Sequence, residues 1–338
     1  MRRAKLWPHE AMWSRSRDDE GQDGRHDADR FRTAVPGHGG SALWPSLTRM
    51  DGVLHAAPRE DENTGTLSGG RQRSSRPGRT DGRSLRKIGG SLSALGPRFA
   101  REVPQGGYAW WYIDGVSDDG NHALTLIAFV GSVFSPYYAV ARSLDRGDPV
   151  NFCALNVALY GPRKHWALTE RTRRDVRRAD AEFVIGPSAV TWDGTDLHVH
   201  IDEVTVPWPS RIKGTVRLSP LATPNSAFAL DGQGRHWWQP FAPCARIELD
   251  LEWPSLRWSG AGYLDCNFGD EPLECAFARW DWFRASREDG ATIIYDVERR
   301  DGSALNLALH LTPGGGIEDF VPPQRVALPT TFWRIART

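Results

Sequence analysis

Two short segments in the last third of the sequence place ionisable side chains among aromatic residues at a spacing that fits β-strands. The segments are GRHWWQPFAP and SGAGYLDCNFG. Because side chains alternate between the two faces of a strand, His236 and Trp238 would share one face of the first segment. Tyr263, Asp265 and Asn267 would share one face of the second. These groups could therefore face a single cavity.

Proton transfer by a buried acid is the chemistry that such a cavity could support. A carboxyl group in an apolar, aromatic pocket has its ionised form disfavoured, so its pKa rises and it can stay protonated near neutrality. Asp265 is the candidate for that acid. The alternative is that Asp265 begins a turn or caps a helix ahead of Phe268-Gly269-Asp270, and these residues fit both interpretations equally well.

Sequence motifs of several other enzyme classes are missing. The chain has no GxGxxG, Walker loop, GxSxG elbow or HExxH, so nucleotide-dependent, serine-hydrolase and zinc-protease functions lack their usual support. The segment HVHIDE offers His198, His200, Asp202 and Glu203, and two histidines on one strand face can share a metal ion. No convincing third ligand accompanies them, so we interpret them as exposed strand histidines. The sequence therefore favours chemistry without a metal or a cofactor.

Short β-strands are the elements that must position these residues. From Val103 onward, β-branched and aromatic runs such as YAWWYIDG, LHVHIDEVTV and LNLALHL alternate with turn residues at spacings of roughly ten. This pattern indicates an all-β antiparallel architecture, and only RTRRDVRRADAEF is typical of a short helix or a charged loop. The length of this part suits two β-barrels, so we predict domains at 101–225 and 226–338, the second carrying the acid.

Residues 1–100 differ in composition from the rest of the chain. They are rich in Gly, Ser, Arg and Asp and lack the hydrophobic periodicity of strands or helices. Such a segment cannot bury enough apolar surface to offset its loss of conformational entropy, so we predict a disordered tail or a mis-called start. An arginine-rich arm for anionic lipid or nucleic acid is the alternative. We interpret the arginine excess as a coding bias and expect no nucleic-acid partner.

Cysteine spacing and hydropathy bear on where the protein works. Cys153, Cys244, Cys266 and Cys275 lack CxxC spacing, so we expect free thiols in a reducing compartment. Twelve of the fifteen tryptophans lie after residue 100, which predicts an aromatic core or an aromatic-lined cavity for a long apolar ligand. No apolar run approaches the ~20 residues of a transmembrane helix, and no signal peptide is apparent. We expect a cytoplasmic protein, with peripheral membrane contact left open.

A series of segments, taken in order, resembles the carotenoid 1,2-hydratase family, also called hydroxyneurosporene synthases. Besides the two segments above, they are EVPQGGYAWWYIDGVSDDG, LIAFVGSVFSPYYA, CALNVALYG, WALTER, IGPSAVTWDG, GYLDCNFGDEPLE and FARWDWFRA. The resemblance runs through nearly all of residues 102–338 and includes none of residues 1–100. It therefore indicates that the tail is dispensable.

The resemblance implies two lipocalin-like β-barrels and a cofactor-independent hydro-lyase of photosynthetic bacteria. Its implied partners are water and an acyclic carotene such as neurosporene or lycopene, hydrated at the terminal C1=C2 double bond to a tertiary alcohol. The family's functional residues match His236, Trp238, Tyr263 and Asp265 in type and spacing. Because a carotene dissolves in membranes, the implied location is peripheral to the inner or intracytoplasmic membrane.

The mechanism that the resemblance implies is acid-catalysed hydration. Asp265 would protonate C2, the faces of Trp238 and Tyr263 would stabilise the cation at C1, and water would capture it. His236 or Asp265 would then accept the spare proton of the water.

Two other functions fit parts of the sequence. A non-catalytic lipocalin-like carrier of an apolar ligand would need no acid. A carbohydrate-active β-protein would use an acid/base pair drawn from Asp265, Glu274 and Asp281, but no spacing identifies such a pair. The ordered resemblance favours the hydratase over both.

Overall fold

The computed structural model of the protein describes residues 96–324 and residue 326. Those up to Val321 belong to one compact unit. The predicted tail lies outside the described residues except for 96–100, where the prediction is wrong at Phe99. That side chain is fully buried, and its ring centroid lies 5.0 Å from that of Trp111. The folded part therefore begins before residue 100.

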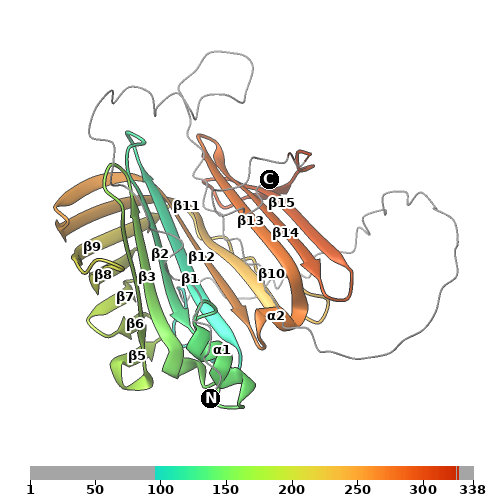
Figure 1. Ribbon diagram of the computed structural model, residues 1–338. Helices are drawn as coiled ribbons and strands as arrows, with labels where there is room; N and C mark the ends of the chain where they lie inside the picture. The colour runs from blue at the N-terminus through green and yellow to red at the C-terminus, as the bar shows by residue number, and fades with distance from the viewer. Residues whose placement is uncertain (1–95, 325, 327–338) are drawn as a thin grey trace, which may run out of the picture. The chain divides into compact units, whose positions relative to one another are not determined.

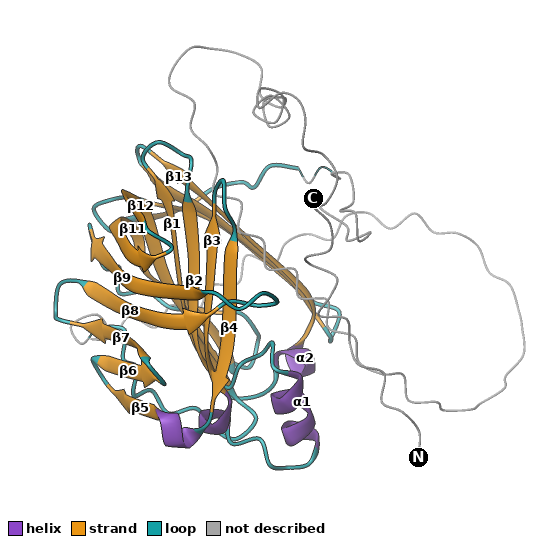
Figure 2. Cartoon of the chain, turned by 60° about the vertical axis from the view of Figure 1, so that its left-hand side comes forward, coloured by secondary structure: helices purple, strands orange, loops and turns teal. Residues whose placement is uncertain are grey.

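An antiparallel sheet of twelve strands dominates the described residues. Its strands are β1 (Tyr108–Ser117), β2 (Ala123–Val130), β3 (Cys153–Tyr160), β4 (His165–Arg171), β5 (Val176–Ala179), β6 (Glu182–Ile185), β7 (Ser188–Trp192), β8 (Leu197–Val204), β9 (Arg211–Pro220), β10 (Phe228–Ala229), β11 (His236–Trp253) and β12 (Leu256–Gly269). They run in the order β4-β3-β2-β1-β12-β11-β9-β8-β7-β6-β5, with β10 paired to β11. The sheet curls into a nearly closed barrel whose seam lies between β4 and β5 (Figure 2).

A second, four-stranded antiparallel sheet follows in the chain (Figure 1). It is a meander of β13 (Phe277–Arg287), β14 (Gly290–Arg299), β15 (Ala304–Leu311) and β16 (Ile317–Asp319). The helices of the described part are α1 (Pro136–Ser143) and α2 (Leu273–Ala276), with 3-10 turns η4 (Pro149–Phe152) and η5 (Arg173–Asp175). None of these helices is long and apolar enough to cross a membrane.

Strand β1 is buried on both faces, which explains its nearly continuous apolar sequence. Ala109, Trp111 and Ile113 point into the barrel core, an apolar cluster that fills the barrel. Tyr108 and Trp110, like Tyr112, point outward into a second cluster, here called the aromatic cluster, which they share with β13, β14 and β15. The four-stranded sheet thus covers the outer face of the barrel wall at β1, β11 and β12.

Helix α1 begins directly after a loop that leaves β2. The hydroxyl of Ser135 accepts a hydrogen bond of 3.0 Å from the backbone N–H of Tyr138, and Pro136 occupies the first helical position. The Tyr138 hydroxyl then donates to the backbone oxygen of Gly107 at 2.6 Å, just before β1. These bonds fix α1 beside the start of β1.

The expected all-β antiparallel architecture is confirmed, and all four cysteines are free thiols. The strand order differs from two separate barrels divided near residue 225. Strands β11 and β12 follow that boundary in sequence, yet they lie between β1 and β9 in one sheet, and the remaining strands form an open sheet. The segment RTRRDVRRADAEF, expected to be helix or loop, forms η5 and the β5–β6 hairpin. Its alternating side chains lie at the seam, where one face of the strands stays exposed.

A close backbone approach between β1 and β12 yields a stability prediction. A Cβ atom at Gly260 would overlap the backbone oxygen of Val116 on β1. We therefore expect Gly260→Ala to lower the free energy of unfolding by about 1–3 kcal/mol, as overpacking does. Urea unfolding measures it, and Gly232→Ala is the control, because a Cβ there meets nothing within 4 Å. Equal free energies of unfolding for the two variants would refute the argument.

Candidate active site

The carboxyl group of Asp265 lies in the middle of β12, pointing into the aromatic cluster, and only 2% of the residue is exposed. Two side chains donate hydrogen bonds to the same oxygen. Trp238 Nε1 donates to Oδ2 at 2.8 Å, and Tyr263 Oη donates to it at 2.7 Å. Asp265 is therefore an interior strand residue, and its alternative interpretation as a turn or helix cap is wrong.

Burial controls the protonation of this carboxyl group. It raises the pKa of Asp265 to about 7, although the hydrogen bonds from Tyr263 and Trp238 pull the pKa down. Among the described residues, none hydrogen-bonds to Oδ1. Both donors thus stabilise one oxygen and leave the other, Oδ1, to carry the proton of a neutral acid.

A small aromatic cavity adjoins the carboxyl group. The space in it open to the centre of a water molecule is about 10 Å³, which is room for about one water. Its lining consists of Trp110, Tyr112, Asp265, Asn267, Trp280, Trp282 and Tyr295. The rings of Trp110 and Trp280 stack at 6.2 Å across the two sheets. The tryptophan-rich composition predicted an aromatic core or an aromatic-lined cavity for a long apolar ligand. The aromatic cluster and this small cavity lie between the sheets, whereas the barrel core is mostly aliphatic.

A buried ion pair beside the cavity joins the two sheets. Arg284 on β13 is 1% exposed and binds both carboxylate oxygens of Asp114 on β1, the Nε contact being 3.1 Å. Tyr112 also donates to Asp114 Oδ2 at 3.2 Å, and the Arg284 guanidinium lies 4.9 Å from the Tyr263 ring centroid. The charge of Asp114 raises the pKa of Asp265 and that of Arg284 lowers it, so the pair acts on the acid with opposing signs.

Sequence reasoning missed this ion pair. A signal for it exists in the single charges of YIDG and WFRA, each within an aromatic strand. A lone charge in such a strand needs a buried partner. The period of one strand does not say which distant strand supplies that partner.

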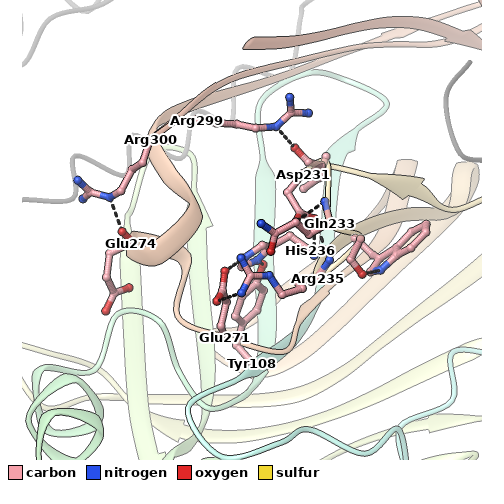
Figure 3. Close-up of polar contacts among 12 residues, drawn as sticks. Tyr108, Asp231, Gln233, Arg235, His236, Glu271, Glu274, Arg299 and Arg300 are labelled. Carbon is pink, nitrogen blue, oxygen red and sulfur yellow. Dashed lines mark hydrogen bonds and ion pairs between the residues drawn. The ribbon is translucent and has the colours of Figure 1, made fainter. Parts of the chain in front are cut away.

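His236 occupies a different environment from the other three predicted site residues (Figure 3). It is fully buried, with Nδ1 2.9 Å from Tyr108 Oη and Nε2 3.3 Å from Glu271 Oε1. Its backbone N–H donates to Asp231 Oδ1 at 2.9 Å. Burial lowers the pKa of His236, and the hydrogen bond that its Nε2–H donates to Glu271 opposes that shift. The structure joins Trp238 and Tyr263 to Asp265 by hydrogen bonds, whereas the side chain of His236 bonds to Tyr108 and Glu271. Of these four predicted residues, only Asp265 is among the described residues that line the cavity.

The other candidate groups do not converge on the cavity. Of the three carboxyls considered for an acid/base pair, only Asp265 lines it; Glu274 on α2 pairs with Arg142 at 2.6 Å, and Asp281 pairs with Arg279 at 2.8 Å. Neither Glu274 nor Asp281 therefore joins Asp265 at the cavity as the second carboxylate of an acid/base pair.

The HVHIDE segment forms part of β8, and its polar side chains do not come together as one site. Glu203 is buried against Arg171, whereas His198 is half-exposed with Nε2 2.8 Å from Asp193 Oδ2. A carboxylate oxygen of Asp196 also lies within 4.8 Å of a ring nitrogen of His198 and a carboxylate oxygen of Asp193, so the three side chains are close enough to hold a metal ion together. However, Asp193 already accepts the backbone N–H groups of residues 195 and 196, and Asp196 is paired with an arginine. Both carboxylates are thus satisfied by the protein.

Comparisons with known proteins point in one direction. The family model described as carotenoid hydratase CrtC matches residues 126–338. The chain is 50% identical to the acyclic carotenoid 1,2-hydratase of Thiocapsa roseopersicina, over 100% of this chain and 84% of that protein. It is 52% identical to the protein of the same name from Rubrivivax gelatinosus, over 92% of this chain and 78% of that protein. It is 41% identical to the acyclic carotenoid 1,2-hydratase of Cereibacter sphaeroides, and that alignment covers 63% of this chain and 75% of that protein. The alignment with the Thiocapsa roseopersicina protein covers the whole chain, so the similarity extends into residues 1–100, which the resemblance found in the sequence did not include.

The Asp265 carboxyl should titrate near neutrality. In NMR spectra of protein labelled at the aspartate carboxyl carbons, we expect one signal with a midpoint of about pH 7, protonated below and ionised above. Tyr263→Phe removes a hydrogen bond that favours the ionised form, so its midpoint should move to higher pH. Asp265→Asn assigns the signal by abolishing it. A midpoint of about 4, as in an exposed aspartate, would refute the burial argument.

Proposed function

The chain belongs to the carotenoid hydratase CrtC family and is an acyclic carotenoid 1,2-hydratase, a hydro-lyase, and we propose that Asp265 is the acid that begins its reaction. One observation carries this proposal. Asp265 is a buried carboxyl at an aromatic cavity, with both hydrogen-bond donors on Oδ2 and Oδ1 unpaired among the described residues. A non-catalytic carrier would have no use for a buried carboxyl group with one oxygen unpaired, because burying an unpaired polar atom is unfavourable.

The first step is protonation of the carotene. Below about pH 7 the carboxyl of Asp265 is mostly neutral and can donate a proton from Oδ1. The π electrons of the C1=C2 bond form the new C2–H bond, and positive charge develops at C1. That carbon bears two methyl groups and the chain, so the cation is tertiary, which decides that the hydroxyl will be attached at C1.

Aromatic rings stabilise the charge at C1. The sequence had assigned this role to Trp238 and Tyr263, but both direct their polar groups at Asp265 Oδ2 and serve to hold the acid. Rings that line the cavity, above all the stacked pair Trp110 and Trp280, are better placed to face the cation. Cation–π attraction in such a desolvated site contributes about 2 kcal/mol.

Water completes the reaction. Its oxygen forms a bond to C1, and its spare proton passes to the Asp265 carboxylate, which restores the acid for the next turnover. Alkene and water are thereby converted to alcohol with no net change in oxidation state, so the scheme requires no cofactor. His236 is engaged by Tyr108 and Glu271 and is assigned a positioning role at the ends of β1 and β12.

We also propose that the enzyme works as a peripheral protein at the cytoplasmic surface of the inner or intracytoplasmic membrane, with α1 as its contact. The exposed apolar residues around α1 are Phe134, Tyr137, Val140 and Leu144. Phe134 lies edge-on to Phe129 at 5.4 Å, and Phe129 lies 6.2 Å from Trp110 of the cavity. This continuous aromatic path suits a substrate that dissolves in hydrocarbon and must reach a buried acid.

Removal of the acidic proton should abolish hydration. We expect Asp265→Asn, which is nearly isosteric, to lose at least about 100-fold in hydration rate while remaining folded. Full-length variants are expressed in lycopene-producing cells, and mass spectrometry of the pigments detects the gain of one or two waters. The control is Asp250→Asn, an exposed carboxyl on β11 that pairs with Arg257. Hydration by Asp265→Asn at the rate of the control would eliminate Asp265 as the acid.

Charges on α1 should weaken membrane binding. We expect the double variant Tyr137→Asp, Val140→Asp to lose most of its sedimentation with phosphatidylcholine vesicles, because both side chains are exposed and apolar. Trp208→Asp is the matched control, since Trp208 is 82% exposed but lies in the β8–β9 turn. If the double variant sediments like the unmodified protein, or if only Trp208→Asp loses binding, α1 is not the contact.

A further inference from the structure

We propose that Trp282 holds the water that attacks C1, together with Asp265; this rests on the function proposed above and adds a binding site for its second substrate. Both residues line the same cavity, with Trp282 6% exposed and Asp265 2% exposed. Among the described residues, neither Trp282 Nε1 nor Asp265 Oδ1 has a hydrogen-bond partner. Two residues that line one cavity thus carry an unsatisfied donor and an unsatisfied carboxyl oxygen.

A bound water satisfies both groups. Buried N–H groups and carboxyl oxygens without partners are unfavourable, and structural waters generally bridge such groups. The space of about 10 Å³ is the size of about one water molecule. The water would accept a hydrogen bond from the indole N–H and lie beside Oδ1. Once Oδ1 has given its proton to C2, the water would donate a hydrogen bond to it.

Trp282 is held firmly enough to position a water. Its ring centroid lies 5.2 Å from that of Tyr112 on β1 and 5.7 Å from that of Tyr263 on β12. Two residues further along the same face of β13, Arg284 is fixed by its ion pair with Asp114. The indole is therefore oriented by contacts with two barrel strands. The N–H group belongs to the four-stranded sheet and the acid belongs to the barrel.

This position decides the fate of the cation. With the indole N–H on one lone pair of the water, the other lone pair is free to form the C1–O bond as a water proton passes to the Asp265 carboxylate. Without the donor, water is poorly placed and capture slows. The cation then more often returns a proton from C2 or a methyl group to the same carboxylate, which regenerates an alkene. Trp282 thus determines how the cation partitions between alcohol and alkene.

The partition can be measured with the full-length protein and lycopene in deuterium oxide. Deuterium enters C2 on protonation, so recovered lycopene that carries deuterium reports cations that formed but escaped capture. We expect Trp282→Phe, which keeps a ring but removes the N–H, to raise the ratio of labelled lycopene to hydrate by about tenfold. Trp237→Phe is the control, because it also removes an indole N–H, one that is bonded to the Gly234 backbone oxygen at 2.7 Å and belongs to a residue of β11 that does not line the cavity. The ratio comes from one reaction and does not depend on the folded fraction.

A near-isosteric replacement covers the case in which Trp282→Phe does not fold. Incorporation of 3-benzothienylalanine at this position keeps both fused rings and replaces the N–H by sulfur, and it should raise the ratio likewise. An unchanged ratio in this protein, or an equal rise in Trp237→Phe, would overturn the role of Trp282. If Asp265→Asn still yields labelled lycopene or hydrate at the rate of the unmodified protein, the proposed function of Asp265 itself fails, which is a distinguishable result.

Discussion

The structure depends on the removal of one carboxyl group from water. Asp265 is useful as an acid only while it is desolvated, because solvation would return its pKa to the ordinary range. The barrel wall alone cannot desolvate it, since Asp265 points away from the barrel core. The four-stranded sheet covers the wall and contributes Trp280, Trp282 and Tyr295 to the cavity. The second sheet is therefore part of the active site.

The outer face of β1 carries the buried carboxylate of Asp114, which needs a partner once the second sheet covers it. Arg284 on β13 is that partner. Each ion would be very unfavourable alone between the sheets, and removing one partner would leave the other uncompensated. As a pair they add little net charge near Asp265, because their effects on its pKa have opposite signs. They also join a residue of β1 to one of β13, and this contact holds the two packed sheets together at that point. The same contact thus serves the packing and the acid.

The local part of this arrangement could be predicted from the sequence. Period-two alternation placed Trp238 on one face of its strand and Asp265 on one face of the next. Because β11 and β12 are neighbours in both chain and sheet, the two side chains meet on the same face. The pairing of β1 with β12 was not predictable, because it joins residues about 150 apart, as in Tyr112 opposite Asp265. Strand counting therefore gave two barrels. It also missed Tyr112 and Arg284, whose roles depend on which strands meet, and it left His236 beside a cavity it does not line.

The double-sided burial of β1 and β12 gives each strand two independent sets of side chains. Residues such as Trp111 and Leu264 pack the barrel, whereas their neighbours Tyr112 and Asp265 form the cavity. Because alternate positions never share a core, selection can vary one set while the other stays constant. A designer who wishes to admit a different isoprenoid could thus reshape one layer of alternate positions and leave the packed core of the barrel unaltered.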